Sequence, residues 1–249
     1  MRVEEYQRMF EAEQRHFWFR GSRAVVESWL RRAIAEAELG DRPSLIDVGA
    51  GTGGMLDRIS GLCDAWGVEY SPDGAAFSHS RGVRVLRGGL PHLPLASDGF
   101  DLALSMDVFE HVEDDVAAMA DVRRVLRPGG RLIMTVPALQ WLWSRHDEAL
   151  HHHRRYDRAM LVSRLEQAGF RVARCSYYNS LLLPPIAAAR FAGRLKQRLA
   201  PSTTPPSSDV SDVYEPLNGL LAGIFAAERH LLAVGSLPLG ASLIADCVA

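Results

Sequence analysis

The sequence feature that most constrains the fold is a regular alternation of short apolar strands with helix-length segments. The first predicted strand, Leu45–Val48, runs directly into a glycine-rich turn and then into a helix near 55–60. Four further strands follow, at 65–68, 83–86, 100–105 and 131–136. Because strands that alternate with helices pair in parallel, this pattern predicts a doubly wound α/β sheet.

Helical additions are expected at both sides of this core. An amphipathic pattern predicts a helix at 22–39. The predicted parts are an N-terminal helical cap at 1–43, the core at 44–177, a helical insertion or lid at 178–239 and the final core strand at 240–249. Pro, Ser and Thr dominate 200–213, as is typical of a flexible linker.

Composition excludes some functions. The chain has 28 Lys and Arg against 30 Asp and Glu, a net charge of −2, which argues against a globally basic nucleic-acid binder. Its three cysteines lack CxxC spacing, so a reducing, cytoplasmic location is expected. The longest uncharged stretches are shorter than the roughly 20 residues of a membrane span. We therefore expect no transmembrane helix, whereas peripheral membrane contact stays open.

The glycine turn points to a cofactor. Gly49, Gly51 and the glycines after them satisfy both GxGxG and GxGxxG, and such turns let a ligand approach the backbone and helix amides closely. Glu69, at the end of the next strand, suits the ribose hydroxyls of either NAD or S-adenosylmethionine. Asp47 would repel a pyrophosphate but suits an ammonium and a sulfonium. The pattern thus favours S-adenosylmethionine.

Four motifs in order carry a family resemblance, and together they span about Ser44 to Ala138. They are LIDVGAGTGG, GVEYSP, LPLASDGFDLALSMDVFEHV and LRPGGRLIMTVP. With them the chain resembles class I S-adenosylmethionine-dependent methyltransferases of the bacterial type 11/12 kind, and in part the ubiquinone-biosynthesis O-methyltransferases. The resemblance implies a Rossmann-like seven-stranded sheet with an antiparallel last strand, which ASLIADCV would supply, plus helical lid insertions.

The resemblance also implies a cofactor site. Asp47 and the glycines would hold the methionine end, Glu69 the ribose, and Tyr70 would lie beside the adenine. The residues assigned to the cofactor are Asp47, Gly49, Gly51, Glu69, Tyr70, Gly89, Leu90, Met106, Trp18 and Arg23.

One part of this site departs from the family pattern, and another leaves a choice of residue open. Gly88-Gly89 stands where many relatives have Gly-Asp, so adenine recognition is expected to rest on backbone groups near Gly89 and Leu90. In HFWFRGSR, an arginine would bind the cofactor carboxylate, and the choice between Arg20 and Arg23 stays open. The same segment could instead be an aromatic anchor that only packs the terminal helix.

A metal site is implied next to the fourth strand. Asp107, Glu110 and His111 resemble the acid-x-x-Glu-His of ubiquinone-biosynthesis O-methyltransferases, which implies a divalent metal, Mg²⁺, near the substrate hydroxyls. The alternative is that Glu110 only complements the dipole of the following helix.

The densest polar cluster of the chain, Asp147 to Tyr156, offers a catalytic base. It resembles a D-E-x-x-x-H-x-R-R-Y stretch of some bacterial methyltransferases, in which His152 takes the histidine position. An imidazole titrates near neutrality and can remove a proton from an attacking oxygen or nitrogen. His111 is the second candidate base. The alternative is a solvated histidine–arginine patch.

The sequence therefore predicts methyl transfer from S-adenosylmethionine, more at oxygen than at carbon or nitrogen, to a small-molecule or lipid-linked acceptor. A nicotinamide-dependent oxidoreductase and a non-catalytic cofactor-binding scaffold of the same fold are the alternatives. A basic amphipathic helix at 186–199 and an apolar helix at 217–234 leave three interpretations open: peripheral membrane contact, a homodimer interface or a substrate-tunnel wall.

Overall fold

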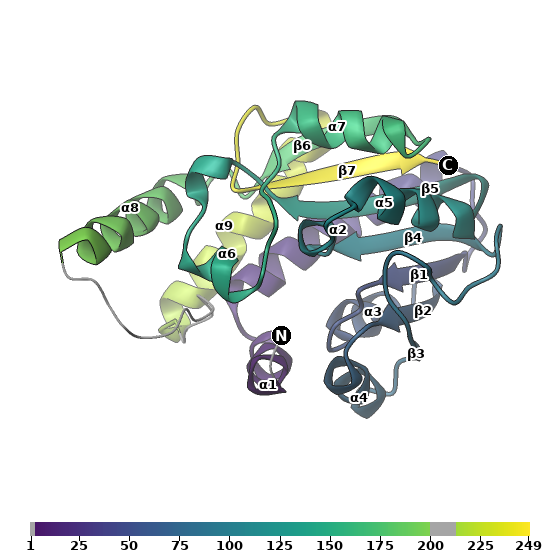
Figure 1. Ribbon diagram of the computed structural model, residues 1–249, viewed down its shortest axis with the longest axis horizontal. Helices are drawn as coiled ribbons and strands as arrows, with labels where there is room; N and C mark the ends of the chain where they lie inside the picture. The colour runs from purple at the N-terminus through teal and green to yellow at the C-terminus, as the bar shows by residue number, and fades with distance from the viewer. Residues whose placement is uncertain (1–2, 200–212) are drawn as a thin grey trace.

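The computed structural model describes residues 3–199 and 213–249, except for the side chains of residues 196–199. Nearly all of the predicted linker at 200–213 lies outside the described residues. Figure 1 shows a central sheet flanked by helices, from which α8 (Leu183–Leu199) projects at one side.

The sheet has seven strands in the order β3-β2-β1-β4-β5-β7-β6. Its strands are β1 (Ser44–Val48), β2 (Asp64–Glu69), β3 (Val85–Arg87), β4 (Phe100–Met106), β5 (Leu126–Pro137), β6 (Arg171–Tyr178) and β7 (Ser242–Val248). β7 lies between β5 and β6 and is antiparallel to both, whereas the pairs among β1 to β5 are parallel. The predicted Rossmann-like sheet with an antiparallel last strand is confirmed.

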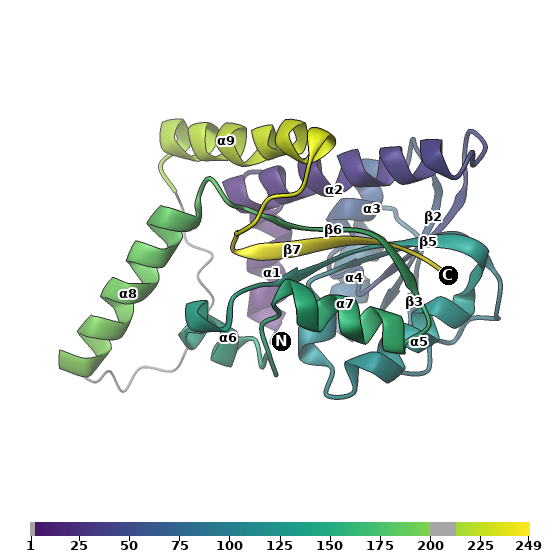
Figure 2. The same cartoon turned by 90° about the horizontal axis from the view of Figure 1, so that it is seen from above.

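Helices cover both faces of the sheet. They are α1 (Val3–Ala12), α2 (Phe17–Glu36), α3 (Gly54–Ile59), α4 (Pro72–Ser80), α5 (Asp115–Val125), α6 (Arg145–Ala149), α7 (Arg158–Gln167), α8 and α9 (Glu215–Val234), with 3-10 turns η1 (Phe109–His111) and η2 (Gln140–Leu142). Figure 2 shows α2 and α9 on one face and α5 and α7 on the other. Leu30 and Phe225 belong to the core of the first face, and Met119 and Leu165 to that of the second.

The helix predicted at 22–39 begins earlier, at Phe17. His16 is its N-cap, and the Nδ1 atom of His16 accepts a hydrogen bond from the amide of Trp18 at 3.3 Å. The aromatic segment that follows His16 is therefore the first turn of α2. The sequence pattern missed this start because Arg20, Gly21 and Ser22 interrupt the run of apolar residues, although Phe17 and Trp18 pack on the same core as the rest of α2.

α9 packs closely on α2, since a Cβ atom on Gly21 would lie 2.4 Å from Cγ of Phe225. Its 20 residues and mean hydropathy of 1.2 meet the length and composition of a membrane span, which corrects the expectation that no segment does. The expectation considered only stretches without charged residues. α9 contains Glu228 and Arg229, yet its mean hydropathy is high enough for a span. One such helix is weak support for a span, because a core helix can pass the same test.

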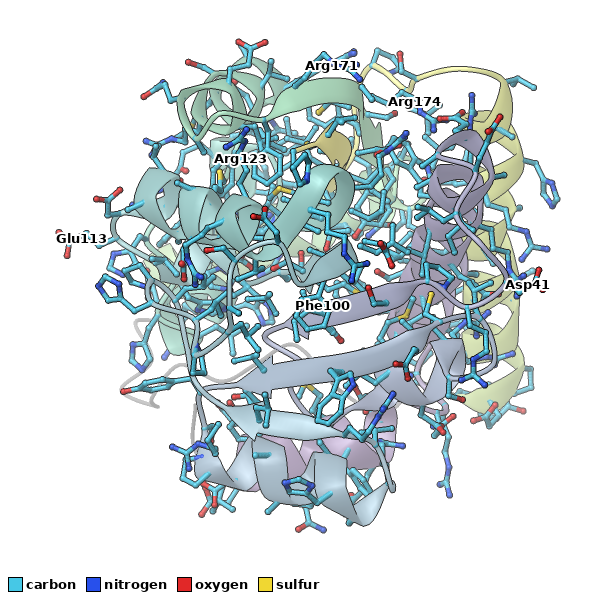
Figure 3. All side chains as sticks on the ribbon, turned by 90° about the vertical axis from the view of Figure 1, so that its right-hand side faces the viewer. Asp41, Phe100, Glu113, Arg123, Arg171 and Arg174 are labelled. Carbon is cyan, nitrogen blue, oxygen red and sulfur yellow. The ribbon has the colours of Figure 1, made fainter. Side chains whose placement is uncertain are left out.

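The loops that line the cavity described below follow the carboxyl ends of the parallel strands, at one side of the sheet. Figure 3 looks at the opposite edge, where Phe100 begins β4 and Arg171 begins β6. The chain changes direction between the neighbouring strands β1 and β4, and ligands of open α/β sheets bind beyond the carboxyl ends at such a switch point.

Candidate active site

A cavity of about 1470 Å³ opens at the carboxyl ends of the strands. Its walls come from the glycine turn and the ends of β2 and β4, and also from α1, the first turns of α2, the segment around α6, and α8. Parts of the predicted cap at 1–43 and of the predicted insertion at 178–239 thus both contribute to its walls. The glycine turn lies at one end of the cavity, and the segment around α6 lies at the other.

The glycine turn is shaped by its glycines. Gly49, Gly51 and Gly53 have φ values of +82°, +59° and +79°, a region that favours glycine. A Cβ atom on Gly49 would also lie 2.4 Å from Cγ2 of Val108. The turn therefore brings glycine backbone to the cavity wall, in front of α3.

Asp47 ends in the cavity wall as a buried carboxyl, 3% exposed. Burial, with the nearby charge of Glu69, raises the pKa of Asp47 to about 7. An ionised Asp47 is costly in this place unless a cation lies beside it. A ligand with an ammonium group would supply that cation.

Glu69 closes the opposite side of the glycine turn. One of its oxygens accepts the Gly51 amide at 2.8 Å, and the other accepts the Ser71 amide at 2.8 Å and the Tyr6 hydroxyl at 3.2 Å. The carboxylate is thus fixed at the cavity wall, and α1 reaches it through Tyr6.

The other residues assigned to the cofactor also line the cavity. Tyr70 is 79% exposed, and a Cβ atom on Gly89 would lie 2.8 Å from its ring. Leu90 and Met106 border the same space. The expected adenine wall of Tyr70, Gly89 and Leu90 is therefore brought together, next to Glu69.

The structure distinguishes Arg20 from Arg23 at the start of α2. Arg23 is buried and lines the cavity together with Trp18, whereas Arg20 is exposed and is not among the lining residues. Burial lowers the pKa of Arg23, which forms an ion pair with Glu13 at 2.6 Å. The charge of Arg23 is thus already compensated within the protein.

Sequence reasoning missed Glu13. This buried carboxylate also accepts the Thr52 hydroxyl at 2.6 Å and pairs with Arg81 at 2.7 Å. It joins the start of α2 to the glycine turn and α4. Its partners are 10, 39 and 68 residues away in sequence, so no local pattern indicates the cluster.

His152 lies at the other end of the cavity. Its Nδ1 atom is 3.0 Å from Oδ1 of Asp147, and its side chain is 6% exposed. Burial alone would raise the pKa of Asp147, but hydrogen bonds from His152 and Arg155 hold that pKa well below its usual range. Because an ionised carboxylate can only accept, Nδ1 of His152 carries a proton in this pair, and Nε2 is the ring nitrogen on the other side.

Glu110 and His111 lie beside this imidazole. Neither carboxylate oxygen of Glu110 has a hydrogen-bond partner among the residues that the structure describes, and burial and then Asp107 raise its pKa well above normal. Burial, with the nearby His152, lowers the pKa of His111 to about 4. The His111 and His152 rings meet edge to face, with centroids 4.6 Å apart.

The expected metal triplet is arranged differently. Within the described ranges, the potential ligand atoms of Glu110, His111 and His152 lie within 4.8 Å of one another, and Asp107 is not in this group. Asp107 follows β4 with φ +54° and accepts the Thr135 hydroxyl at 3.1 Å. The turn η1 carries Glu110 toward the segment of His152 instead.

The neighbouring cluster residues have structural partners. Arg155 pairs with Asp147 at 2.7 Å, and Arg154 pairs with Asp115 at 2.9 Å. His151 and His153 line the cavity and are exposed. The two arginines therefore fix the loop rather than forming a free anion clamp.

Asn179, which sequence reasoning also missed, follows β6. It is 1% exposed, has φ +54° and lines the cavity, and its Oδ1 atom has no partner among the described residues. Such buried acceptors are unusual in proteins unless a ligand or water reaches them. A non-glycine residue at positive φ after a strand is not visible in a single sequence.

Comparisons with known proteins agree with this geometry. Residues 46–134 match a family described as "Methyltransferase domain". A "Probable S-adenosylmethionine-dependent methyltransferase" of Mycolicibacterium smegmatis is 29% identical over 63% of this chain and 60% of that protein. A ubiquinone/menaquinone biosynthesis C-methyltransferase of Paracoccus denitrificans is 36% identical over 43% of this chain and 49% of that protein. The chain thus spans about half to three fifths of the length of these relatives.

Solved structures show the same fold. A methyltransferase of Thermotoga maritima, described as a possible histamine N-methyltransferase, has a TM-score of 0.58 and 20% identity, covering 99% of this chain and 95% of its own. A chain from the complex of the Haloferax volcanii Trm112 methyltransferase activator with a methyltransferase has a TM-score of 0.61 and 18% identity, covering 99% and 94%.

Proposed function

We propose that this chain, whose residues 46–134 match a methyltransferase domain, is a class I S-adenosylmethionine-dependent methyltransferase that methylates a hydroxyl group of a small-molecule or lipid-linked acceptor. One observation carries the proposal: the glycine turn with its two acids borders the same cavity as His152, whose Nδ1 atom bonds the buried Asp147 behind it. A donor site and a proton acceptor in one enclosed space are what methyl transfer to a hydroxyl requires.

The residues at the glycine turn fit this donor. Asp47 is a buried carboxyl that a ligand ammonium would stabilise in its ionised form. Glu69 would receive the ribose hydroxyls, and Tyr70 with Gly89 and Leu90 would enclose the adenine. When bound, S-adenosylmethionine supplies a methyl group already activated by its positive sulfur.

The residues at the other end would move the proton. As the acceptor oxygen forms its bond to the methyl carbon and the carbon–sulfur bond breaks, the hydroxyl proton passes to Nε2 of His152. Asp147 holds Nδ1–H and stabilises the imidazolium that results. Glu110 and Asn179 offer acceptors to further hydroxyl or amine donors of the substrate. His111 is the second candidate base.

The parts added to the core would enclose this reaction. We propose that the cap at 1–43 covers the donor, because Tyr6, Trp18 and Arg23 line the cavity. We propose that 178–239 is a lid over the acceptor, because α8 lines the opposite end. Excluding water strengthens the electrostatic contacts within the site.

Calorimetric titration tests the donor. S-adenosylhomocysteine should bind with one site per chain and NADH should not. Tight binding of NADH alone would favour the nicotinamide-dependent oxidoreductase, which the matched relatives do not favour. A protein that binds S-adenosylhomocysteine yet leaves every candidate oxygen, carbon and nitrogen acceptor unmodified would be a cofactor-binding scaffold.

A second candidate, a divalent metal at the acceptor end, is favoured by the unpartnered carboxylate of Glu110 next to two imidazoles. Glu110, His111 and His152 would be its ligands, and this donor set suits Zn²⁺ better than Mg²⁺, which prefers oxygen. A bound metal lowers the pKa of a coordinated hydroxyl. Metal analysis of Glu110→Gln should then show lost metal, with Asp107→Asn as the control that retains it.

A further inference from the structure

α8 has two faces of different character, and the inner one belongs to the cavity. Arg190 and Arg194, one turn apart, line the cavity and reach the segment before α6. Arg190 donates to the Ser144 hydroxyl, and Arg194 donates to the carbonyl of Trp143 at 2.7 Å. The described arginines of α8 therefore face inward, where the sequence alone indicated only a basic helix face.

The outer face of α8 is an exposed apolar stripe. It consists of Pro184, Ala188, Phe191 and Leu195, which are all exposed and follow one another at intervals of three to four residues. Phe191 is 69% exposed and Leu195 is 58% exposed. Figures 1 and 2 both show α8 projecting from the body of the protein, and the part of the chain that the structure describes leaves this stripe exposed. Large exposed apolar side chains gathered on one face mark a contact surface.

The charge of α8 distinguishes between the surfaces that could cover it. The helix has four basic residues and no acidic one, and the sequence from 167 to 208 has no acidic residue. In a two-fold dimer formed through α8, each basic helix would lie against its own copy, and like charges would oppose the contact. An anionic lipid surface would instead attract the helix.

We propose that the apolar face of α8 docks on an anionic lipid surface. Phe191 and Leu195 insert at the boundary between headgroups and acyl chains, and the positive charge of the helix, whose sequence has no acidic residue, attracts the anionic headgroups. The protein stays cytoplasmic and binds reversibly.

The other face of the same helix lines the cavity, so docking would place the acceptor end of the cavity at the membrane surface. An acceptor with an apolar chain would then enter from the lipid. This consequence rests on the proposed function, whereas the docking itself does not.

Vesicle flotation of the full chain without cofactor tests the docking. Vesicles of phosphatidylcholine with phosphatidylglycerol should float with bound protein. Vesicles of phosphatidylcholine alone should bind at least about tenfold less protein. The double substitution Phe191→Glu with Leu195→Glu should lower binding to the anionic vesicles by about tenfold or more. The matched control, Leu217→Glu with Leu220→Glu, adds the same charges to the exposed face of α9 and should leave binding unchanged.

Three results would overturn the proposal. They are no difference between the two vesicle types, loss of binding in the α9 variant but not in the α8 variant, and a wild-type dimer in light scattering that the α8 variant converts to a monomer. The last result would assign the stripe to a second copy of the chain. Equal S-adenosylhomocysteine affinity of both variants verifies their folding and keeps this test separate from that of the methyl-transfer proposal.

Discussion

The two ends of the cavity are built in different ways. At the donor end, formed by the glycine turn, Glu69 accepts three hydrogen bonds and Glu13 pairs with two arginines, whereas the buried Asp47 has a raised pKa that a ligand cation would lower. At the acceptor end, formed around His152, neither the carboxylate of Glu110 nor Oδ1 of Asn179 has a hydrogen-bond partner among the described residues. The donor end therefore suits a ligand that brings a positive charge, and the acceptor end suits a ligand that brings hydrogen-bond donors.

The largest expected effect is the loss of turnover when the proposed base at the acceptor end is removed. His152→Ala should lower turnover, followed as release of S-adenosylhomocysteine, by roughly 10²-fold or more, the scale of a lost general base. His151→Ala and His153→Ala should do much less, because only His152 has the orienting bond to Asp147. If the three variants behave alike, the histidines form a collective charged surface and His111 becomes the candidate base.

The second effect concerns stability at the donor end. Because burial raises the pKa of Asp47 to about 7 from 3.8, the folded cofactor-free protein holds this proton more tightly than the unfolded chain. The stabilisation is complete below about pH 3.8 and is lost as the pH rises through about 7. Asp47→Asn should therefore raise the free energy of unfolding at pH 8 by roughly 1–4 kcal/mol and change it little at pH 4.

Urea unfolding at both pH values measures this difference in the absence of cofactor. Equal effects of Asp47→Asn at pH 8 and pH 4 would mean that Asp47 is not a strained carboxyl, and that the donor end is not prepared for a cation.

A smaller effect tests whether the cap competes with the cofactor. In the cofactor-free protein the Tyr6 hydroxyl donates a hydrogen bond to Glu69, the carboxylate proposed to bind the ribose. Tyr6→Phe should therefore raise S-adenosylhomocysteine affinity by about two- to tenfold, the worth of one net hydrogen bond. Weaker binding of this variant would show that Tyr6 assists the ligand instead of competing with it.

The smallest expected effect is that of chelation. If His152 is the base, EDTA should leave turnover unchanged, and added Zn²⁺ should lower it by occupying Nε2 next to Glu110 and His111. If EDTA abolishes turnover and a divalent metal restores it, the role of His152 as the base is contradicted and the metal site is favoured.

The same contrast explains what could be predicted from the sequence. The strands, the antiparallel last strand and the donor residues follow from contiguous motifs, because residues at the ends of neighbouring parallel strands share one edge. Asp47, Glu69 and the Tyr70–Gly89 wall all lie where these motifs predict.

The acceptor end could be predicted only in part. His152 was identified from a local pattern, but its bond to Asp147 and its proximity to Glu110 depend on how the segment after β5 folds back on η1. The roles of Asn179 and Glu13 could not be predicted from the sequence, because elements distant in sequence surround both residues. The inward turn of Arg190 and Arg194 on α8 likewise depends on the segment before α6.

The most direct test of the central claim, that donor and acceptor ends are separate parts of one methyltransferase site, is calorimetric titration of S-adenosylhomocysteine into three proteins. The wild type should bind it, Asp47→Ala should lose about 1.5–3 kcal/mol of binding free energy, and His152→Ala should stay within a few-fold of the wild type. Equal weakening in both variants would contradict the division of the cavity. Unchanged affinity in Asp47→Ala would place the cofactor elsewhere.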